Sequence, residues 1–142
     1  MAKFNIARAL QDAVRSGGLP CKVLADGATV VIDNRTAYGP DAVVQCGATI
    51  DLDALTIAEP MIVVEVISPS SAKNDAAVKT PDYFSLPSVA HVLVVDPVKK
   101  LITKHSRGTG QLLSTEFLRV GQTVQLDPPG IEFPVADCFA DL

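Results

Sequence analysis

The spacing of apolar residues changes along the chain from helical to strand-like, and this change predicts the first elements. Residues 5–16 are predicted to form a helix, with Asn5 as a candidate N-cap and Gly17-Gly18 as a stop signal. The apolar residues that support this helix lie at helical spacing: Ile6, Leu10, Ala13 and Val14.

Short β-branched runs follow the helix and are typical of strands. Residues 21–26 and 28–33 flank Gly27, a pattern that favours two strands joined by a tight turn. A third strand is predicted over residues 41–46. An acidic loop that ends at Pro60 follows it and holds Asp51, Asp53 and Glu59.

Two later runs have no polar face and are predicted to be strands buried on both sides of a sheet, over residues 61–67 and 90–95. Between them, the turn Ser68–Ser71 is predicted to cap a helix over 72–85, which Pro81 would kink or break. The end of the chain is β-rich, with shorter strands predicted over 100–106, 111–117 and 123–126 and then a loop with a short turn.

This order of elements predicts a mixed sheet with helices on its faces, in the α/β or α+β class. The 142 residues suffice for one domain, which we place at 1–142. Because 48% of the residues are hydrophobic and 20% are charged, the composition excludes a disordered chain. No apolar run approaches the roughly 18 residues that a membrane helix needs, so a transmembrane protein is not expected.

The charge of the chain is unevenly distributed. Twelve Lys and Arg against sixteen Asp and Glu give a net charge of −4, the wrong sign for a protein that coats nucleic acid non-specifically. Lys99, Lys100, Lys104 and Arg107 nevertheless form a short basic segment. Two interpretations stay open: the segment contacts a phosphate backbone, or it is an edge strand protected by lysines.

The three cysteines, Cys21, Cys46 and Cys138, are far apart in sequence. An odd count without a Cys-x-x-Cys pair, in a chain with no signal peptide, argues against a disulfide scaffold and against a zinc ribbon. Reduced, buried thiols in a cytoplasmic protein are therefore expected.

Glu65 is the one charged residue inside the apolar run 61–67. Strand alternation places it on the same face as Val63 and Ile67, and burying a carboxylate there is costly unless it is paired, metal-bound or protonated. The alternative is a structural salt bridge or a solvated place at the rim of the sheet.

Asp41 stands at the mouth of another apolar strand and forms an acidic pair with Glu65. Two carboxylates at neighbouring strand ends can share a hard cation, and Mg²⁺ suits a site that has few protein oxygens and is completed by water and phosphate. The alternative for Asp41 alone is a turn residue after Gly39-Pro40.

A cation near such a metal site would help phosphodiester hydrolysis by positioning water or by neutralising charge on the phosphate. The position two residues after Glu65 would face the same side, but it holds Ile67. Lys79 is the next candidate, since Asp75, Lys79 and Tyr83 share one face of the predicted helix. An ordinary exposed Asp–Lys pair is the alternative.

Several strings along the chain resemble the Uma-two family, whose members are proposed restriction endonucleases of the PD-(D/E)XK nuclease superfamily. The resemblance extends from about residue 1 to the C-terminus and is strongest between Pro40 and Asp96. It rests on Pro40-Asp41-Ala42-Val43-Val44, on Val63-Val64-Glu65-Val66-Ile67-Ser68-Pro69-Ser70, on Asp75, Lys79 and Tyr83, on Pro87-Ser88-Val89 and on Val92-Leu93-Val94-Val95-Asp96.

The resemblance implies a restriction endonuclease-like core of one helix, three strands, a helix and a strand, followed here by a β-rich C-terminal extension. It implies that Asp41 and Glu65 bind the metal, with the carbonyl of Val66 as a third ligand. It also implies that Lys79 acts from the helix, in place of the superfamily lysine whose position Ile67 fills.

The chain departs from the family pattern in two places. Family members begin with a further helix and hairpin, so the resemblance implies a chain shortened at its N-terminus. The second departure, Thr80-Pro81-Asp82, interrupts the helix that carries Lys79 and Tyr83, and would misplace either side chain if the helix broke there.

The first hypothesis for function is an endonuclease that hydrolyses DNA with Mg²⁺, or with Mn²⁺, by in-line attack of a metal-activated water on phosphorus. Asp41, Glu65 and Lys79 would be catalytic, and Asp75 and Tyr83 would support them. The alternative is an inactive nuclease-like domain that binds a protein or dimerises. A homodimer would also suit an endonuclease, because cutting both strands needs two sites.

Acid–base or nucleophilic hydrolysis without a metal fits the sequence poorly. The only histidines are His91 and His105, and His91 lies in a buried strand pattern that is typical of a core residue. No glycine-rich loop for a nucleotide phosphate is present.

Overall fold

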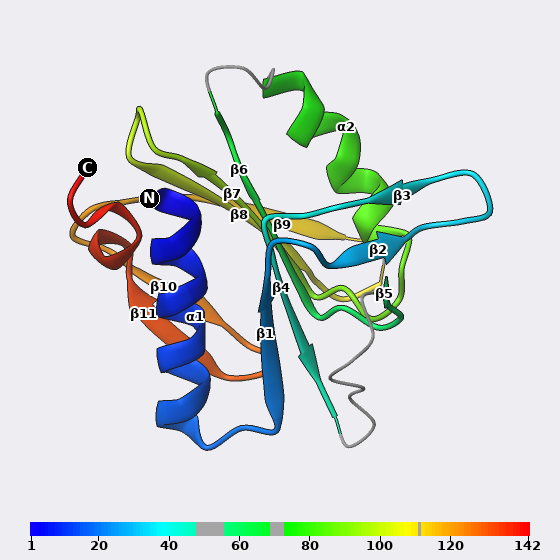
Figure 1. Ribbon diagram of the computed structural model, residues 1–142, viewed down its shortest axis with the longest axis horizontal. Coiled ribbons are helices and arrows are strands. Elements are labelled where there is room, and N and C mark those ends of the chain that lie inside the picture. Colours follow the sequence, from blue (N-terminus) through cyan, green and yellow to red (C-terminus); the bar gives the residue numbers. More distant parts are fainter. Residues whose placement is uncertain (48–55, 69–72, 111) are drawn as a thin grey trace.

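The computed structural model describes residues 1–47, 56–68, 73–110 and 112–142. A six-stranded mixed sheet runs through the protein in the strand order β1-β4-β6-β7-β8-β9 (Figure 1). β6 and β7 are parallel, and the other neighbours are antiparallel. The strands are β1 (Cys21–Ala25), β4 (Ala42–Cys46), β6 (Ile62–Val66), β7 (His91–Asp96), β8 (Leu101–Arg107) and β9 (Leu113–Arg119).

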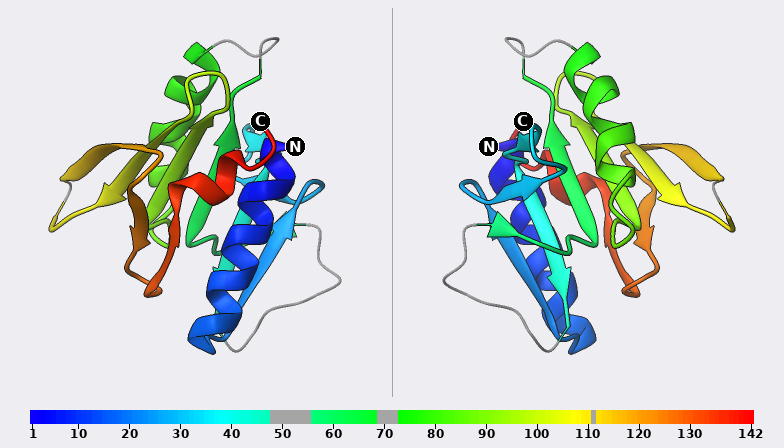
Figure 2. Two further views of the ribbon diagram at one scale, coloured as in Figure 1. Left: turned by 90° about the vertical axis from the view of Figure 1, so that its left-hand side faces the viewer. Right: turned by 90° about the vertical axis from the view of Figure 1, so that its right-hand side faces the viewer.

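Helices cover both faces of this sheet. The first face packs against α1 (Ala2–Gly17), the hairpin of β10 (Thr123–Leu126) and β11 (Ile131–Pro134), and the short 3₁₀ helix η1 (Val135–Phe139), which lie together in Figure 2. The second face packs against α2 (Lys73–Phe84). The order α1, β1, β4, β6, α2, β7 confirms the predicted core of helix, three strands, helix and strand.

β6 shows why the sheet has a hydrophobic core on each side. Ile62 and Val64 are fully buried in the core under α1, whereas Val63 is fully buried in the core under α2. Successive side chains of a strand point to opposite faces, so a run without a polar face needs cover on both. The prediction of a strand buried on both sides is therefore confirmed, and Glu65 faces the α2 side with Val63.

The first helix begins earlier than predicted, and Asn5 is not its N-cap. The N-cap is Met1, and Asn5 is a buried residue whose side-chain amide donates to the carbonyl oxygen of Ala140 at 2.9 Å. Asn5 thus ties α1 to the C-terminal segment. The predicted stop is confirmed, since Gly18 takes the left-handed conformation that ends many helices, with φ of 61°.

The predicted hairpin of residues 21–26 and 28–33 is wrong. β1 pairs with β4, and β2 (Thr29–Val31) belongs to a separate small sheet with β3 (Ala37–Tyr38) and β5 (Thr56–Ile57). The turn that β2 uses lies further along the chain, where the Ile32 N–H donates to the carbonyl of Thr36. The β2–β3 hairpin projects from the body (Figure 1), and Tyr38 of this hairpin contacts Lys79 and Asp82 of α2. The predicted acidic residues Asp51 and Asp53 lie outside the described residues.

The expectation of three reduced cysteines is also wrong. Cys21 and Cys46 face each other at the end of the β1–β4 ladder and form a disulfide. The sequence did not show this, because the pairing depends on a register between strands separated by 25 positions. Cys138 is a buried free thiol, as expected.

The other boundaries differ from prediction mainly at the C-terminus. The segment predicted as a final loop forms β11 and η1, because Ile131, Phe133 and Val135 alternate into the core under α1. α2 passes through Pro81 without a break. Pro81 has no N–H to donate to the carbonyl four positions earlier in the helix. In the same turn, the Thr80 hydroxyl donates to the carbonyl of Ala76 at 2.8 Å and supports the helix there.

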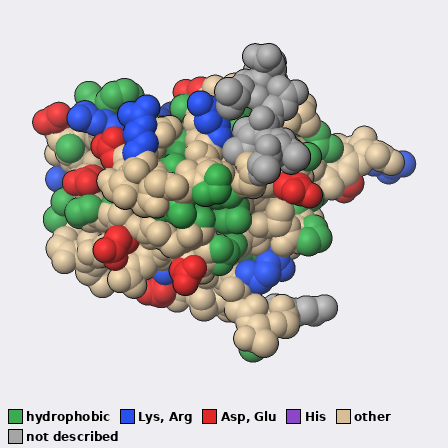
Figure 3. Space-filling model, turned by 90° about the horizontal axis from the view of Figure 1, so that it is seen from below, with side chains coloured by type: hydrophobic (Ala, Val, Ile, Leu, Met, Phe, Trp, Pro, Cys, Tyr) green, Lys and Arg blue, Asp and Glu red, His purple; other side chains and the backbone are tan. Residues whose placement is uncertain are grey.

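The surface has no single sign of charge on the face seen from below in Figure 1. Acidic, basic and hydrophobic side chains lie side by side there (Figure 3). Within the described ranges, no helix has the length and apolar character needed to cross a membrane.

Candidate functional site

A cavity of about 190 Å³ opens where the start of β4 and the end of β6 meet the two helices. We call it the site cavity. It brings most of the predicted site residues together, since Asp41, Glu65, Val66, Asp75 and Lys79 all line it. Its full lining is Lys3, Gly39, Asp41, Glu65, Val66, Ile67, Ser68, Asp75, Ala76 and Lys79.

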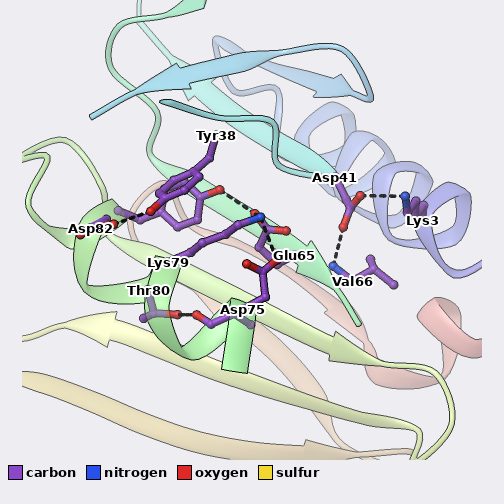
Figure 4. A network of polar contacts seen from close by, with 11 residues as sticks. Lys3, Tyr38, Asp41, Glu65, Val66, Asp75, Lys79, Thr80 and Asp82 are labelled. Atoms are coloured by element: carbon purple, nitrogen blue, oxygen red, sulfur yellow. Dashed lines mark hydrogen bonds and ion pairs between the residues drawn. The ribbon is translucent and has the colours of Figure 1, made fainter. Parts of the chain in front are cut away.

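Asp41 is fixed to β6 by its backbone and by its side chain. Asp41 stands directly before β4, whose first residue Ala42 is the register partner of Val64, and the Asp41 N–H donates to the carbonyl of Val64 at 2.9 Å. Its Oδ2 accepts a hydrogen bond of 2.6 Å from the N–H of Val66 (Figure 4). This geometry turns the Asp41 carboxylate toward the end of β6.

Glu65 is largely buried, with a side chain that is 12% exposed. The hydroxyl of Tyr83 donates to Glu65 Oε1 at 2.6 Å, and Lys79 Nζ lies 3.6 Å from the same oxygen. Burial raises the pKa of Glu65, and the Tyr83 hydrogen bond and the Lys79 charge oppose part of that rise. The pKa of Tyr83 is raised by burial and by its bond to Glu65.

Lys79 lies on the face of α2 that packs against the sheet, and its ammonium reaches Glu65. Its ammonium also pairs with Asp75 at 3.2 Å, one helical turn earlier, as the spacing predicts. The Lys79 side chain is 18% exposed and the Asp75 side chain is 55% exposed, so the pair is shielded at its lysine end and open to solvent at its aspartate end. Because α2 is unbroken at Pro81, both Lys79 and Tyr83 meet Glu65, and the predicted misplacement does not occur.

Sequence reasoning missed Tyr38, which packs beside the catalytic candidates. The Lys79 ammonium lies 5.2 Å from the centre of the Tyr38 ring, and the Tyr38 and Tyr83 rings meet edge to face at 5.5 Å. The Tyr38 hydroxyl donates to Asp82 at 2.5 Å, and this bond raises the pKa of Tyr38. No local signal marks Tyr38, because the fold of the β2–β3 hairpin brings it there.

Sequence reasoning also missed Lys3. This residue of the first turn of α1 places its ammonium 3.0 Å from Asp41 Oδ1 (Figure 4). The contact with Asp41 raises the pKa of Lys3. The sequence shows Lys3 only as a polar position on an amphipathic helix.

The basic segment predicted for phosphate contact is not one surface. Lys104 is buried, donates to the carbonyl of Gln125 at 2.8 Å and pairs with Glu116 at 3.1 Å. Arg107 holds the carbonyls of Val89, Phe84 and Leu86 on the α2 side. Lys100 donates to the carbonyl of Leu142, and Lys99 follows β7. None of the four lines the site cavity.

His91 is a core residue, in line with its buried strand pattern. Its Nδ1 lies 2.7 Å from the Ser106 hydroxyl and its Nε2 lies 2.8 Å from the Pro128 carbonyl. Since Nε2 must donate to that carbonyl, Nδ1 accepts from Ser106. Burial lowers the pKa of His91.

The donor set of the site cavity suits a hard divalent cation. Asp41 and Glu65 supply carboxylate oxygens from neighbouring strands. The Val66 carbonyl lies on the same edge of β6 as its N–H, the edge that Asp41 holds. Among described residues, no cluster of three or more His, Cys, Asp and Glu is arranged to hold a metal, so water or substrate would complete the shell.

Comparisons with known proteins agree with this architecture. The Uma2 family model, described as "Putative restriction endonuclease", matches residues 2–136. Among solved structures, a protein of Anabaena variabilis ATCC 29413 described as a "putative nuclease belonging to DUF820" matches with a TM-score of 0.76 and 11% identity. That match covers 98% of this chain and 78% of the other, and at this identity it shows the fold. The search of curated proteins found no match.

Proposed function

Since the chain belongs to the Uma2 family of proteins described as putative restriction endonucleases, we propose that it is an endonuclease that hydrolyses DNA phosphodiester bonds with Mg²⁺ or Mn²⁺. One observation carries the proposal: the acidic pair Asp41 and Glu65 and the amine of Lys79 line the same cavity.

Asp41, Glu65 and the Val66 carbonyl would hold the metal in this proposal. The metal would supply Lewis acidity and lower the pKa of a bound water, which is the chemistry that phosphodiester hydrolysis at neutral pH requires. Both carboxylates are already paired with ammonium groups, Asp41 with Lys3 and Glu65 with Lys79. A bound cation would therefore have to compete with these ammonium groups for the carboxylate oxygens.

The remaining residues would orient the substrate and the carboxylates. Lys79 presents an ammonium at the cavity wall, where it would neutralise charge that develops on a phosphate oxygen. Asp75 and the Tyr38 ring hold that ammonium from two sides. Tyr83 donates to Glu65 and so fixes the direction of its carboxylate.

Cleavage of a supercoiled plasmid in Mg²⁺ and in Mn²⁺ tests the proposal. Asp41→Asn, Glu65→Gln and Lys79→Met should each reduce the rate by about a hundredfold or more. Lys22→Met is the matched control for charge, because Lys22 is exposed on β1 opposite Gln45, near the disulfide. Cleavage that survives the two carboxylate substitutions would assign the activity to another site or to a contaminant.

Metal binding supplies a second measurement that does not depend on activity. The wild-type protein should show a calorimetric Mn²⁺ signal that Glu65→Gln removes. A folded wild-type protein without such a signal, and without cleavage, would instead support an inactive nuclease-like domain.

A further inference from the structure

Lys3 and Asp41 form an ion pair whose two ends differ in exposure to solvent. The Lys3 side chain is 52% exposed, whereas the Asp41 side chain is 12% exposed. Asp41 is held by the β6 backbone through both its N–H and its Oδ2, so Lys3 takes only the remaining oxygen, Oδ1. In this pair the carboxylate is the more constrained group, since two backbone bonds hold Asp41 and most of its side chain is shielded from solvent.

A divalent cation bound to Asp41 would compete directly with Lys3. The Val66 N–H is bonded to Oδ2, and the Lys3 ammonium lies 3.0 Å from the other carboxylate oxygen, Oδ1. A metal ion and an ammonium group on the same carboxylate oxygen would repel each other, and more strongly where they are partly shielded from water. Because Lys3 stands on the first turn of α1 with a flexible, half-exposed stem, it is the group that would give way.

The displaced ammonium would remain at the wall of the site cavity. Lys3 lines that cavity together with Lys79, and the two lysines approach it from different helices, α1 and α2. The charges of Asp26 and Glu65 also act on Lys3 and favour keeping a cation there. A lysine released from its carboxylate has three donors and no acceptor, which suits a phosphate oxygen.

We propose that Lys3 is the counter-ion of Asp41 in the metal-free protein, that a divalent metal displaces it, and that it then contacts a backbone phosphate of the DNA. This inference rests on the proposed function and extends it to a second phosphate-binding lysine.

Calorimetric titration with Mn²⁺, without DNA, tests the displacement. Lys3→Met should bind Mn²⁺ about threefold to tenfold more tightly than the wild type, because the metal no longer competes with an ammonium. Lys22→Met removes the same charge from the far end of the β1–β4 pair and should bind Mn²⁺ as the wild type does. Thermal midpoints in EDTA establish that each variant is folded.

Plasmid cleavage at saturating Mn²⁺ tests the phosphate contact. Lys3→Met should raise KM for DNA with little change in kcat, and the dependence of log KM on log salt concentration should lose roughly one phosphate contact. Lys22→Met should leave both values unchanged.

The outcomes separate the inference from the function beneath it. Equal Mn²⁺ affinity in Lys3→Met and the wild type would overturn the displacement, while the nuclease assignment would stand on Asp41 and Glu65. Tighter Mn²⁺ binding with an unchanged KM would overturn the phosphate contact. If neither protein binds Mn²⁺ in a way that Asp41→Asn removes, the nuclease proposal itself fails.

Discussion

The Asp41 carboxylate accepts a hydrogen bond of 2.6 Å from the backbone N–H of Val66, the residue directly after Glu65. The Asp41 N–H donates to Val64, the residue directly before Glu65. Asp41 is therefore hydrogen-bonded to the residues on both sides of Glu65, and these bonds form without any metal. The relative position of the two carboxylates is set by the sheet, which is the preorganisation that a metal site on neighbouring strands requires.

Asp41 should consequently contribute to stability as well as to metal binding. Asp41→Ala leaves the Val66 N–H without its acceptor and should lower the free energy of unfolding by about 1–3 kcal/mol. Asp41→Asn keeps a side-chain carbonyl oxygen for that N–H and should cost less stability, although both variants should lose the proposed metal binding. Urea denaturation in EDTA measures the difference, and equal losses in the two variants would contradict this role.

Glu65 should destabilise the metal-free fold at neutral pH. Burial raises the pKa of Glu65 above its value in the unfolded chain, so the free-energy contribution of this group is favourable at low pH and is lost as pH rises through the folded pKa. Glu65→Gln, an uncharged group of the same shape, should therefore be at least as stable as the wild type at pH 8.

The comparison at low pH is the control for Glu65→Gln. Below the unfolded pKa the wild-type carboxyl is protonated in both states, so any advantage of the variant should disappear. Urea unfolding in EDTA at the two pH values measures this. A variant that is less stable than the wild type at pH 8 would show that the Lys79 ion pair outweighs the desolvation of Glu65.

The Tyr83 hydroxyl should set the pH at which the metal binds. Its hydrogen bond lowers the pKa of Glu65, so Tyr83→Phe should raise that pKa further. Because the proposed metal would bind the ionised carboxylate, the midpoint of Mn²⁺ binding against pH should move upward.

Tyr38→Phe is the matched control for Tyr83→Phe. Its hydroxyl donates to Asp82 and not to Glu65, while its ring packs against that of Tyr83. The same binding midpoint in the wild type and in Tyr38→Phe, with a shifted one in Tyr83→Phe, is the expected pattern. Equal shifts in both variants would mean that the effect comes from ring packing.

The site was predictable where local periodicity decides the geometry. Alternation along β6 predicted that Glu65 shares a face with Val63, which the structure shows to be the α2 side, and one-turn spacing placed Asp75, Lys79 and Tyr83 on one helix face. The acidic pair of Asp41 and Glu65 followed from their places at strand ends. Each of these relationships involves few residues within one element, so it does not depend on how distant parts of the chain pack.

The contacts that were missed depend on how distant segments pack. Lys3 meets Asp41 because α1 crosses the start of β4, and Tyr38 meets Lys79 because β3 turns back toward α2. Asn5 is a residue type that often caps helices, but here it is buried and its side chain donates a hydrogen bond to the carbonyl of Ala140. Tertiary context overrides local propensity in each case, so no pattern along the sequence contains this information.

The disulfide should be detectable as a difference in thiol reactivity and in stability. The described cysteines are Cys21 and Cys46, which are bonded, and Cys138, which is buried and has a pKa raised by burial to about 12. The native oxidised protein should therefore not react with a thiol reagent, and one thiol should appear on unfolding without reductant.

Reduction should then expose two more thiols and weaken the fold. Closing a loop between residues 25 positions apart restricts the unfolded chain by about 3 kcal/mol in the chain-entropy account. The double substitution Cys21→Ser and Cys46→Ser should behave as the reduced protein and should not respond to reductant. Three reactive thiols in the oxidised protein after unfolding would show that the bridge does not form.

His91 should make the protein less stable as pH falls below neutrality. Burial lowers the pKa of His91, so the unfolded chain takes up a proton first as pH drops through about 6.5, and the free energy of unfolding decreases from there down to the folded pKa. His105 contributes with the same sign, because burial also lowers its pKa. His91→Gln should thus reduce the slope of stability between pH 7 and pH 5 without abolishing it.

Neighbouring groups also act on the pKa of His91, so the effect of His91→Gln on the pH dependence reports on this buried site. Lys104 lowers the pKa of His91, while Asp127 and the Pro128 carbonyl raise it. His91→Gln loses part of the polar contact with Pro128 and Ser106 and should be less stable than the wild type at pH 7, where the histidine is neutral. Guanidinium denaturation at several pH values gives both quantities. An unchanged pH slope in His91→Gln would mean that the imidazole keeps an ordinary pKa in the folded protein.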